Sequence, residues 1–127
     1  MPKLLDSHAD ARPHEMAVAD EHGRTTWAEL HNRTRRLINV FADAGIHKGD
    51  TIAMLMGNRR ECFEVFQACA HAGITYVPVN WHSVTEELAY VLEDSGATAL
   101  IAGARFADLA TDALEDPRAA DVNVAFV

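Results

Sequence analysis

The 127-residue sequence is short of cysteine, and this shortage excludes a class of protein. Its two cysteines, Cys62 and Cys69, are too few for the disulfide framework of a small secreted scaffold. They lie seven residues apart in a predicted helix, so their Cα atoms are about 10 Å apart along the axis, too far for one disulfide. We therefore predict two reduced, buried thiols in this helix, facing a sheet, which fits a reducing compartment.

Positive charge and long hydrophobic runs are also scarce. The 11 Lys and Arg residues face 19 Asp and Glu residues, which gives a net charge of -8. Nucleic acids and anionic membranes require clustered cations, so the composition argues against both as partners. No apolar run approaches the roughly 20 residues of a transmembrane helix, and the first residues lack the basic start and apolar core of a signal peptide. These features predict a cytoplasmic protein.

Helical and extended segments alternate along most of the chain. Residues 1–12 show no periodicity, which predicts a loose tail. Residues 17–19 and 24–26 flank a glycine-containing turn, which predicts a short hairpin. Four amphipathic or apolar segments with helical spacing then alternate with four short apolar runs of strand length. In chain order, we expect a helix over 26–45, a strand over 51–56, a helix over 58–73, a strand over 75–79, a helix over 83–96, a strand over 99–102, a helix over 106–116 and a strand over 122–127.

Local signals mark several of the predicted helix ends. A polar residue followed three positions later by Glu predicts a capping pair, and this spacing occurs at Thr26 with Glu29, Asn58 with Glu61, and Ser83 with Glu86. Glycine followed by isoleucine, at 45 and 73, predicts Schellman-type helix ends. The alternation of elements predicts right-handed crossovers between parallel strands, and hence an α/β fold with an open, mostly parallel sheet and flanking helices. Because no linker interrupts residues 13–127, we expect them to form one domain.

Two turns that follow predicted strands are candidate sites, because ligands of open α/β sheets bind beyond the carboxyl ends of the strands. Gly57-Asn58-Arg59-Arg60 can hold a phosphate at a helix N-terminus, or it is a capped helix start with two solvated arginines. In Asn80-Trp81-His82-Ser83, an indole ring stands beside an imidazole. Trp81 and His82 can stack on a planar ligand or contact a phosphate; alternatively, Trp81 fills a packing gap and His82 faces water.

Other catalytic patterns are missing or weak. The sequence contains no G-x-G-x-x-G, no G-x-x-x-x-G-K-[ST] and no G-x-S-x-G motif. Its seven histidines are scattered and none is paired with another at i, i+4, so we predict no zinc site. The acidic pairs Glu86-Glu87 and Glu93-Asp94 are a candidate carboxylate pair, or they only stabilise the helix that carries them.

Several short segments, in order and at matching spacing, resemble the adenylate-forming superfamily of acyl-CoA synthetases over about residues 13–127. The opening motif of that family, Thr-Tyr/Trp-x-Glu-Leu, is similar to Thr26-Trp27-Ala28-Glu29-Leu30. The other matching segments are Gly45-Ile46-x-Lys48-Gly49-Asp50, Ile52-Ala53, Asn58-x-x-Glu61, Ala70-x-Ala72-Gly73-x-x-Tyr76-Val77-Pro78-Val79-Asn80, Glu86-Glu87-Leu88 and Asp94-Ser95-Gly96-Ala97.

The resemblance implies the first α/β subdomain of an ATP-dependent acyl-CoA ligase that acts on fatty acids or related acids. Such a ligase converts a carboxylate to an acyl-adenylate and then to an acyl-CoA, so ATP, Mg and CoA are implied for a parent enzyme. The family's phosphate loop, its aromatic-acidic Mg-ATP motif and its C-terminal lysine do not occur in this sequence. We therefore expect no catalytic residue, metal site or cofactor in this truncated domain, and no catalysis by it alone.

The resemblance also implies a CoA contact and partners. Asn80-Trp81-His82 is the counterpart of an Asn-Pro-Arg motif whose arginine meets CoA phosphate in some members, so His82, with Trp81, is the candidate CoA contact. The expected partners are the acyl substrate and the remaining subdomains of the parent. Without those subdomains, the apolar second helix and the strand over 122–127 lack cover, so the isolated chain is expected to form a homo-oligomer. The alternative is a free-standing, non-catalytic binding or interaction module.

Overall fold

The computed structural model describes residues 2–127, with side chains from residue 3 onward. The chain divides into two compact units. Unit 1 comprises Met1–Lys48 and Asn58–Ile74, and unit 2 comprises Gly49–Gly57 and Thr75–Val127. Each unit therefore combines two stretches that are separated in the sequence, a division that local patterns do not reveal. The predicted single domain over residues 13–127 stays a prediction.

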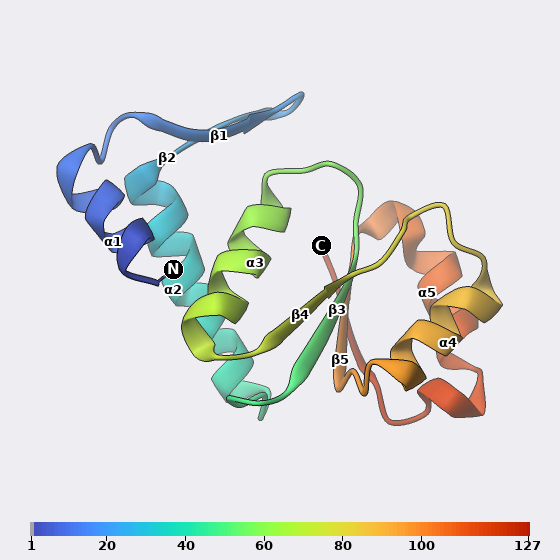
Figure 1. The fold of residues 1–127 in the computed structure, drawn as a ribbon. Helices are drawn as coiled ribbons and strands as arrows, with labels where there is room; N and C mark the ends of the chain where they lie inside the picture. The colour runs from blue at the N-terminus through green and yellow to red at the C-terminus, as the bar shows by residue number, and fades with distance from the viewer. Residues whose placement is uncertain (1) are drawn as a thin grey trace. The chain divides into compact units, whose positions relative to one another are not determined.

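Unit 2 contains the predicted parallel sheet (Figure 1). Its strands are β3 (Thr51–Leu55), β4 (Thr75–Pro78), β5 (Ala99–Ala102) and β6 (Asn123–Phe126), in the order β4-β3-β5-β6, and every neighbouring pair is parallel. The two inner strands, β3 and β5, are buried almost throughout, as expected of continuous apolar runs inside a parallel sheet. The α/β fold class with an open parallel sheet is thus confirmed.

Two helices of unit 2 lie against the sheet: α4 (Thr85–Asp94) and α5 (Ala107–Leu114) (Figure 1). Short 3-10 turns, η1 (Ala104–Phe106) and η2 (Pro117–Ala119), flank α5. Leu88 and Leu92 of α4 pack in one buried cluster with Leu55 of β3 and Leu100 of β5. Full burial of one leucine side chain contributes about 1.5–3 kcal/mol, so this cluster is a main source of the unit's stability.

Unit 1 contains three helices and a hairpin. The helices are α1 (Pro2–Ala11), α2 (Trp27–Asp43) and α3 (Glu61–Ala72), and the hairpin pairs β1 (Met16–Asp20) with β2 (Gly23–Thr26) in antiparallel fashion. The predicted hairpin and the two predicted helices are therefore present. No helix in the described residues is long and apolar enough to cross a membrane.

The loose tail predicted over residues 1–12 is wrong, because most of this segment forms α1. Leu5 is 2% exposed, and the ring of His8 lies 4.5 Å from the ring of Trp27, measured between centroids. Two adjacent leucines are too few to produce a helical period in the sequence. The contacts that α1 makes with α2 stabilise a helix that local periodicity does not predict.

Of the three predicted capping pairs, only the first is confirmed. Thr26 Oγ1 accepts a hydrogen bond from the N–H of Glu29 at 3.3 Å, and Glu29 Oε2 accepts one from the N–H of Thr26 at 2.8 Å. Asn58 does not cap α3, which begins after Arg60 with no side-chain cap from its own cap residue. Ser83 does not cap α4 either. The cap residue there is Val84, one position later, whose N–H donates to Glu87 Oε2 at 3.2 Å.

The glycine-isoleucine helix ends are confirmed. Gly45 and Gly73 have φ values of 76° and 70°, in the left-handed region that favours glycine. The N–H of Ile46 donates to the carbonyl of Phe41, and the N–H of Ile74 donates to the carbonyl of Cys69, both at 2.9 Å. These bonds satisfy carbonyls that the end of each helix would otherwise leave without a partner.

Both cysteines lie in α3 and neither forms a disulfide, as predicted, but they are not equally buried. Cys69 is 0% exposed, whereas Cys62 is only half-buried, so the prediction of two buried thiols is wrong for Cys62. Burial raises the pKa of the Cys69 thiol to about 11. At neutral pH Cys69 is therefore a protonated, inaccessible and unreactive thiol.

We expect iodoacetamide to alkylate Cys62 well before Cys69 in the native chain at about pH 8, because only the accessible thiolate reacts. Mass spectrometry of tryptic peptides over time measures the two rates separately. A Cys62→Ser variant should retain only the slow phase, and denatured protein, the control, should label both sites at similar rates. Native labelling of Cys69 as fast as that of Cys62 would contradict the burial of Cys69.

Candidate functional site

The candidate site lies at the carboxyl edge of the sheet in unit 2. Pro78 of β4 pairs with Met54 of β3, and Ala102 of β5 pairs with Leu55, the next residue of β3. Because the three strands are parallel and end at nearly the same level, the loops that follow β4 and β5 leave the sheet at the same edge on either side of β3. This edge is where ligands of open α/β sheets bind.

The loop after β4 holds Trp81 and His82, the two residues singled out by the sequence. Asn80 organises the turn, since its Oδ1 accepts the N–H of His82 and its carbonyl accepts the N–H of Ser83, both at 3.0 Å. The rings of Trp81 and His82 are stacked, with centroids 3.6 Å apart and planes 31° apart. Trp81 is partly buried against the core of unit 2, whereas His82 is exposed. The indole therefore anchors the imidazole at the surface.

The loop after β5 contributes Arg105, which sequence reasoning missed. Its guanidinium carbon lies 5.4 Å from the ring centroid of Trp81 and 4.9 Å from that of Phe106, distances typical of cation–π contact. Phe106 is buried, so it is a fixed support. A signal for Arg105 existed, because it follows the third predicted strand by three residues, in the kind of turn where sites occur. Only the tertiary structure brings it to Trp81.

These side chains suit a ligand that carries negative charge. Arg105 has no carboxylate partner among residues 3–127, so the hydrogen-bond donors of its guanidinium are uncommitted. His82 adds an exposed imidazole, and the ring of Trp81 contacts both this imidazole and the guanidinium of Arg105. A permanent cation, an imidazole and an aromatic ring together provide the contacts that a phosphorylated, planar ligand requires.

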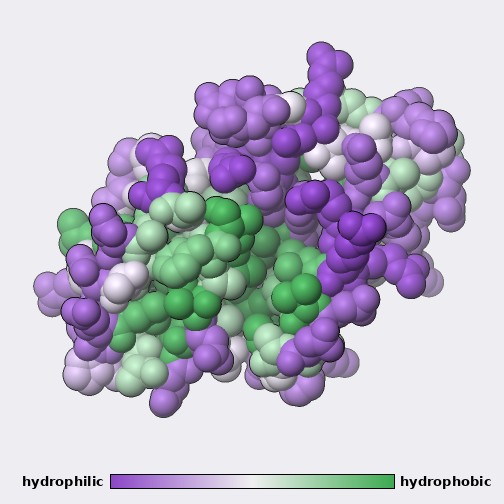
Figure 2. Space-filling model, turned by 180° about the vertical axis from the view of Figure 1, so that it is seen from behind, coloured by the Kyte–Doolittle hydropathy of each residue, from purple (hydrophilic) through white to green (hydrophobic). Residues whose placement is uncertain are grey.

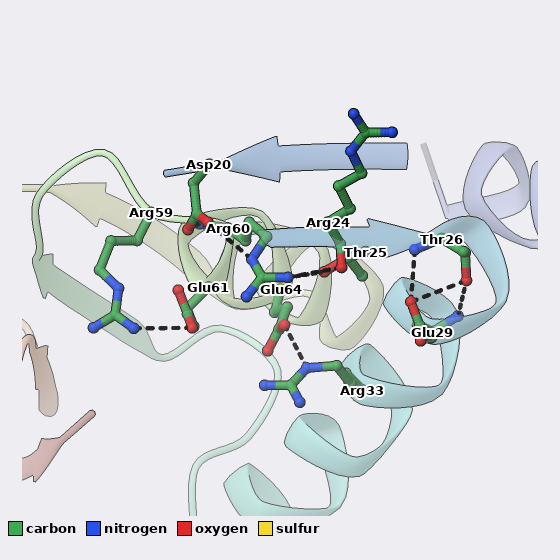
Figure 3. Close-up of polar contacts among 10 residues, drawn as sticks. All are labelled: Asp20, Arg24, Thr25, Thr26, Glu29, Arg33, Arg59, Arg60, Glu61 and Glu64. Atoms are coloured by element: carbon green, nitrogen blue, oxygen red, sulfur yellow. Dashed lines mark hydrogen bonds and ion pairs between the residues drawn. The ribbon is translucent and has the colours of Figure 1, made fainter. Parts of the chain in front are cut away.

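The second candidate, Gly57-Asn58-Arg59-Arg60, is not a phosphate site (Figure 3). The N–H of Arg60 donates to Asp20 Oδ2 at 3.0 Å, so a carboxylate of the chain itself occupies the start of α3. This backbone bond is the main reason why the pKa of Asp20 lies below its ordinary value. The alternative of two solvated arginines is also wrong, because Arg60 pairs with Asp20 and Arg59 donates to Glu61 at 3.2 Å.

The remaining sequence candidates do not assemble into a site. Glu86 and Glu87 lie in the first turn of α4, where the Glu87 carboxylate holds the N–H of Val84, and Glu93 and Asp94 lie in its last turn. These positions favour the structural alternative over a catalytic carboxylate pair. Within residues 3–127, no group of three or more His, Cys, Asp or Glu side chains is arranged to hold a metal ion.

Comparison with known proteins identifies the family. Residues 5–125 match the family model described as AMP-binding enzyme, so the chain belongs to this family, as the sequence motifs predict. It is 43% identical over 91 residues to a feruloyl-CoA synthase of an Amycolatopsis species, covering 70% of this chain and 18% of the relative. It is 33% identical over 108 residues to a 2-succinylbenzoate–CoA ligase of Geobacillus sp. (strain WCH70), covering 85% and 22%.

Solved structures of the same family also match this chain over part of their length. A benzoate CoA ligase from Burkholderia xenovorans LB400 superposes with a TM-score of 0.93 at 25% identity, covering 99% of this chain and 25% of the ligase. The fold matches the N-terminal domain of adenylate-forming enzymes. The chain spans about a fifth of the length of the curated relatives that it matches.

Proposed function

We propose that the chain is a non-catalytic part of a larger ATP-dependent ligase that joins a carboxylic acid to CoA. The observation that carries this proposal is the family match over residues 5–125 in a chain about a fifth as long as its relatives. The reaction would run through an acyl-adenylate, and the other subdomains of the ligase would be the chain's partners. Because relatives are named for feruloyl, 2-succinylbenzoate and benzoate substrates, an aromatic acid is as well supported as the fatty acid expected from the motifs.

ATP, Mg and CoA are the cofactors that the family implies for the whole ligase. CoA supplies the thiol that accepts the acyl group and carries phosphates on its nucleotide end. Trp81, His82 and Arg105 fit that end, because they combine a ring face with donors for a phosphate. At position 82, a neutral imidazole offers one hydrogen-bond donor, whereas the arginine of the family motif would offer a charged guanidinium with several donors. Arg105 supplies such a guanidinium from the neighbouring loop, and this compensates for histidine at position 82.

Two further expectations belong to this proposal. A cytoplasmic location rests on the acidic composition and the features of the first residues, and it stays a prediction. Residues 13–127 are proposed to act as one structural region of the ligase, with the catalytic groups supplied by other subdomains. A free-standing binding module, the alternative, would use the same Trp81 and Arg105 surface but would need no other subdomain.

The purified 127-residue chain should show no ATP–pyrophosphate exchange with benzoate, ferulate or a fatty acid, because the phosphate loop and the catalytic lysine of the family do not occur in it. A complete benzoate CoA ligase assayed in parallel is the positive control. Heat-labile exchange catalysed by this chain would show that it carries catalytic groups of its own.

Replacement of His82 or Arg105 by Ala in a full-length ligase that contains this chain should raise the KM for CoA. For Arg105→Ala we expect about a tenfold rise, the size of one lost charge-assisted hydrogen bond, and a smaller rise for His82→Ala. The rate of acyl-adenylate formation, measured without CoA, should not change. Arg35→Ala, which removes an exposed charge in unit 1, is the matched control. An unchanged KM for CoA in both variants would contradict the CoA contact, and Trp81 would then only fill a packing gap while His82 faces water.

We also propose that the isolated chain self-associates through β6, the edge strand of the sheet. All four residues of β6 are exposed, with Val124 at 38% and Phe126 at 48%. The N–H of Asn123 donates to the carbonyl of Thr98, just before β5, and the N–H of Val127 donates to the carbonyl of Ala102. Because backbone groups alternate in direction along a strand, those of Val124 and Phe126 lie on the open edge. Hydrophobic side chains gather on the face of the molecule opposite to that of Figure 1 (Figure 2).

Sedimentation equilibrium at micromolar concentration should therefore detect a dimer or a larger species of the isolated chain. Val124→Lys places a charge on the edge strand and should shift the population toward monomer. The matched control is Val40→Lys, because Val40 of α2 is also exposed, at 57%, but lies outside β6. A monomeric wild-type chain, or equal effects of the two lysines, would argue against association through β6.

A further inference from the structure

Unit 1 contains an arginine-lined groove that the proposed function does not use. Its volume is about 460 Å³, and its walls come from β2, α2 and the region where α3 begins. Four of the 11 Lys and Arg residues of the chain line it: Arg24, Arg33, Arg36 and Arg60. The basic residues are therefore concentrated in one place, although the chain as a whole has a net charge of -8.

The carboxylates that share this groove are already committed to the protein (Figure 3). Glu29 caps α2, Glu64 accepts from Arg33 Nε, and Glu61 Oε1 accepts from Arg59. The side chains of Glu64 and Glu61 are only 12% and 16% exposed. Glu61 Oε2 has no hydrogen-bond partner, but it is buried and a ligand in the groove cannot reach it. Glu61 and Glu64 are therefore recessed, whereas Glu29 is exposed but held by its bonds to Thr26.

Much of the positive charge, in contrast, remains available. Arg33 is 54% exposed, and its Nε bond to Glu64 leaves both terminal nitrogens for other acceptors. Arg36 and the side chain of Arg24 have no hydrogen-bond or ion-pair partner among residues 3–127. Arg33 and Arg36 are three residues apart on α2 and thus lie on neighbouring turns of the same helix face. The accessible lining of the groove is consequently dominated by guanidinium groups.

We propose that this groove binds a small polyanion, a molecule with two or more phosphate or carboxylate groups. Arg33 and Arg36 would bind the anionic groups, since guanidinium forks match phosphate and carboxylate oxygens two at a time. The Arg24 side chain points away from Arg33 and Glu64 and is not part of the proposed contact (Figure 3). Glu64 fixes the direction of Arg33 in advance, which lowers the entropy lost on binding. The volume lies within the range of small-molecule sites. All residues that line this groove belong to unit 1, whereas Trp81, His82 and Arg105 belong to unit 2.

Isothermal titration of the 127-residue chain with inorganic pyrophosphate and, in a second arm, with citrate tests this proposal. We expect saturable binding of at least one probe that weakens as salt is added, because the attraction is between exposed charges. Binding of pyrophosphate alone would assign a phosphate ligand, and binding of citrate alone would assign a polycarboxylate. Absence of saturable binding of either probe at millimolar concentration would overturn the proposal.

Arg36→Gln is the decisive variant, because Arg36 has no partner in the described part of the chain whose loss would affect folding. It should weaken binding about fivefold, the effect of one partly exposed charged contact. Arg35→Gln is the matched control: it removes the same charge from the neighbouring, exposed position of α2, which does not line the groove. Equal weakening by the two variants would mean that only net charge matters, and it would overturn the site. Thermal melts of both variants verify that they are folded.

Discussion

The alignment of β3 with β4 and β5 is the constraint on which the candidate site in unit 2 depends. Packing of the inner strands fixes this register, because a shift by one residue would turn Leu55 or Leu100 to the other face of the sheet, out of the cluster that they form with α4. With the register fixed, the loops after β4 and β5 leave one edge of the sheet at the same level. The apolar core thereby determines where Arg105 meets Trp81, although neither side chain is central to that core.

A buried carboxylate has the corresponding role in unit 1. The Asp20 side chain is 7% exposed and accepts hydrogen bonds from the backbone of Arg60 and from two backbone N–H groups of its own hairpin turn. Arg60 in turn donates to the carbonyl of Arg24 at 2.7 Å, which ties α3 to β2. Asp20 thus replaces an external anion at the start of α3. It also commits Arg60 to the fold and leaves the more exposed arginines of α2 available.

The arginines of this chain therefore differ in function according to their partners. Arg60 and Arg59 pair with carboxylates and are structural, whereas Arg105 contacts two aromatic rings and Arg36 has no hydrogen-bond or ion-pair partner among the described side chains. A guanidinium is costly to leave unpaired when it is buried but not when it is exposed, so exposure and the nearest carboxylate decide which arginines can bind a ligand. In this member of the AMP-binding enzyme family, Arg105 of unit 2 and Arg36 of unit 1 are among the arginines that remain available by this criterion.

The sequence by itself determined the features that depend on near neighbours. The capping box of Thr26 and Glu29, the glycine-isoleucine helix ends and the alternation of strands and helices all follow from spacings of a few residues. The family followed as well, because its motifs are local and occur in a specific order. Only the tertiary structure decided the helical state of residues 2–11, the cap of α3 and the stack of Arg105 on Trp81. Each of these depends on a partner distant in sequence, such as Trp27 for α1 or Asp20 for α3, and no local pattern specifies which distant side chain the fold will supply.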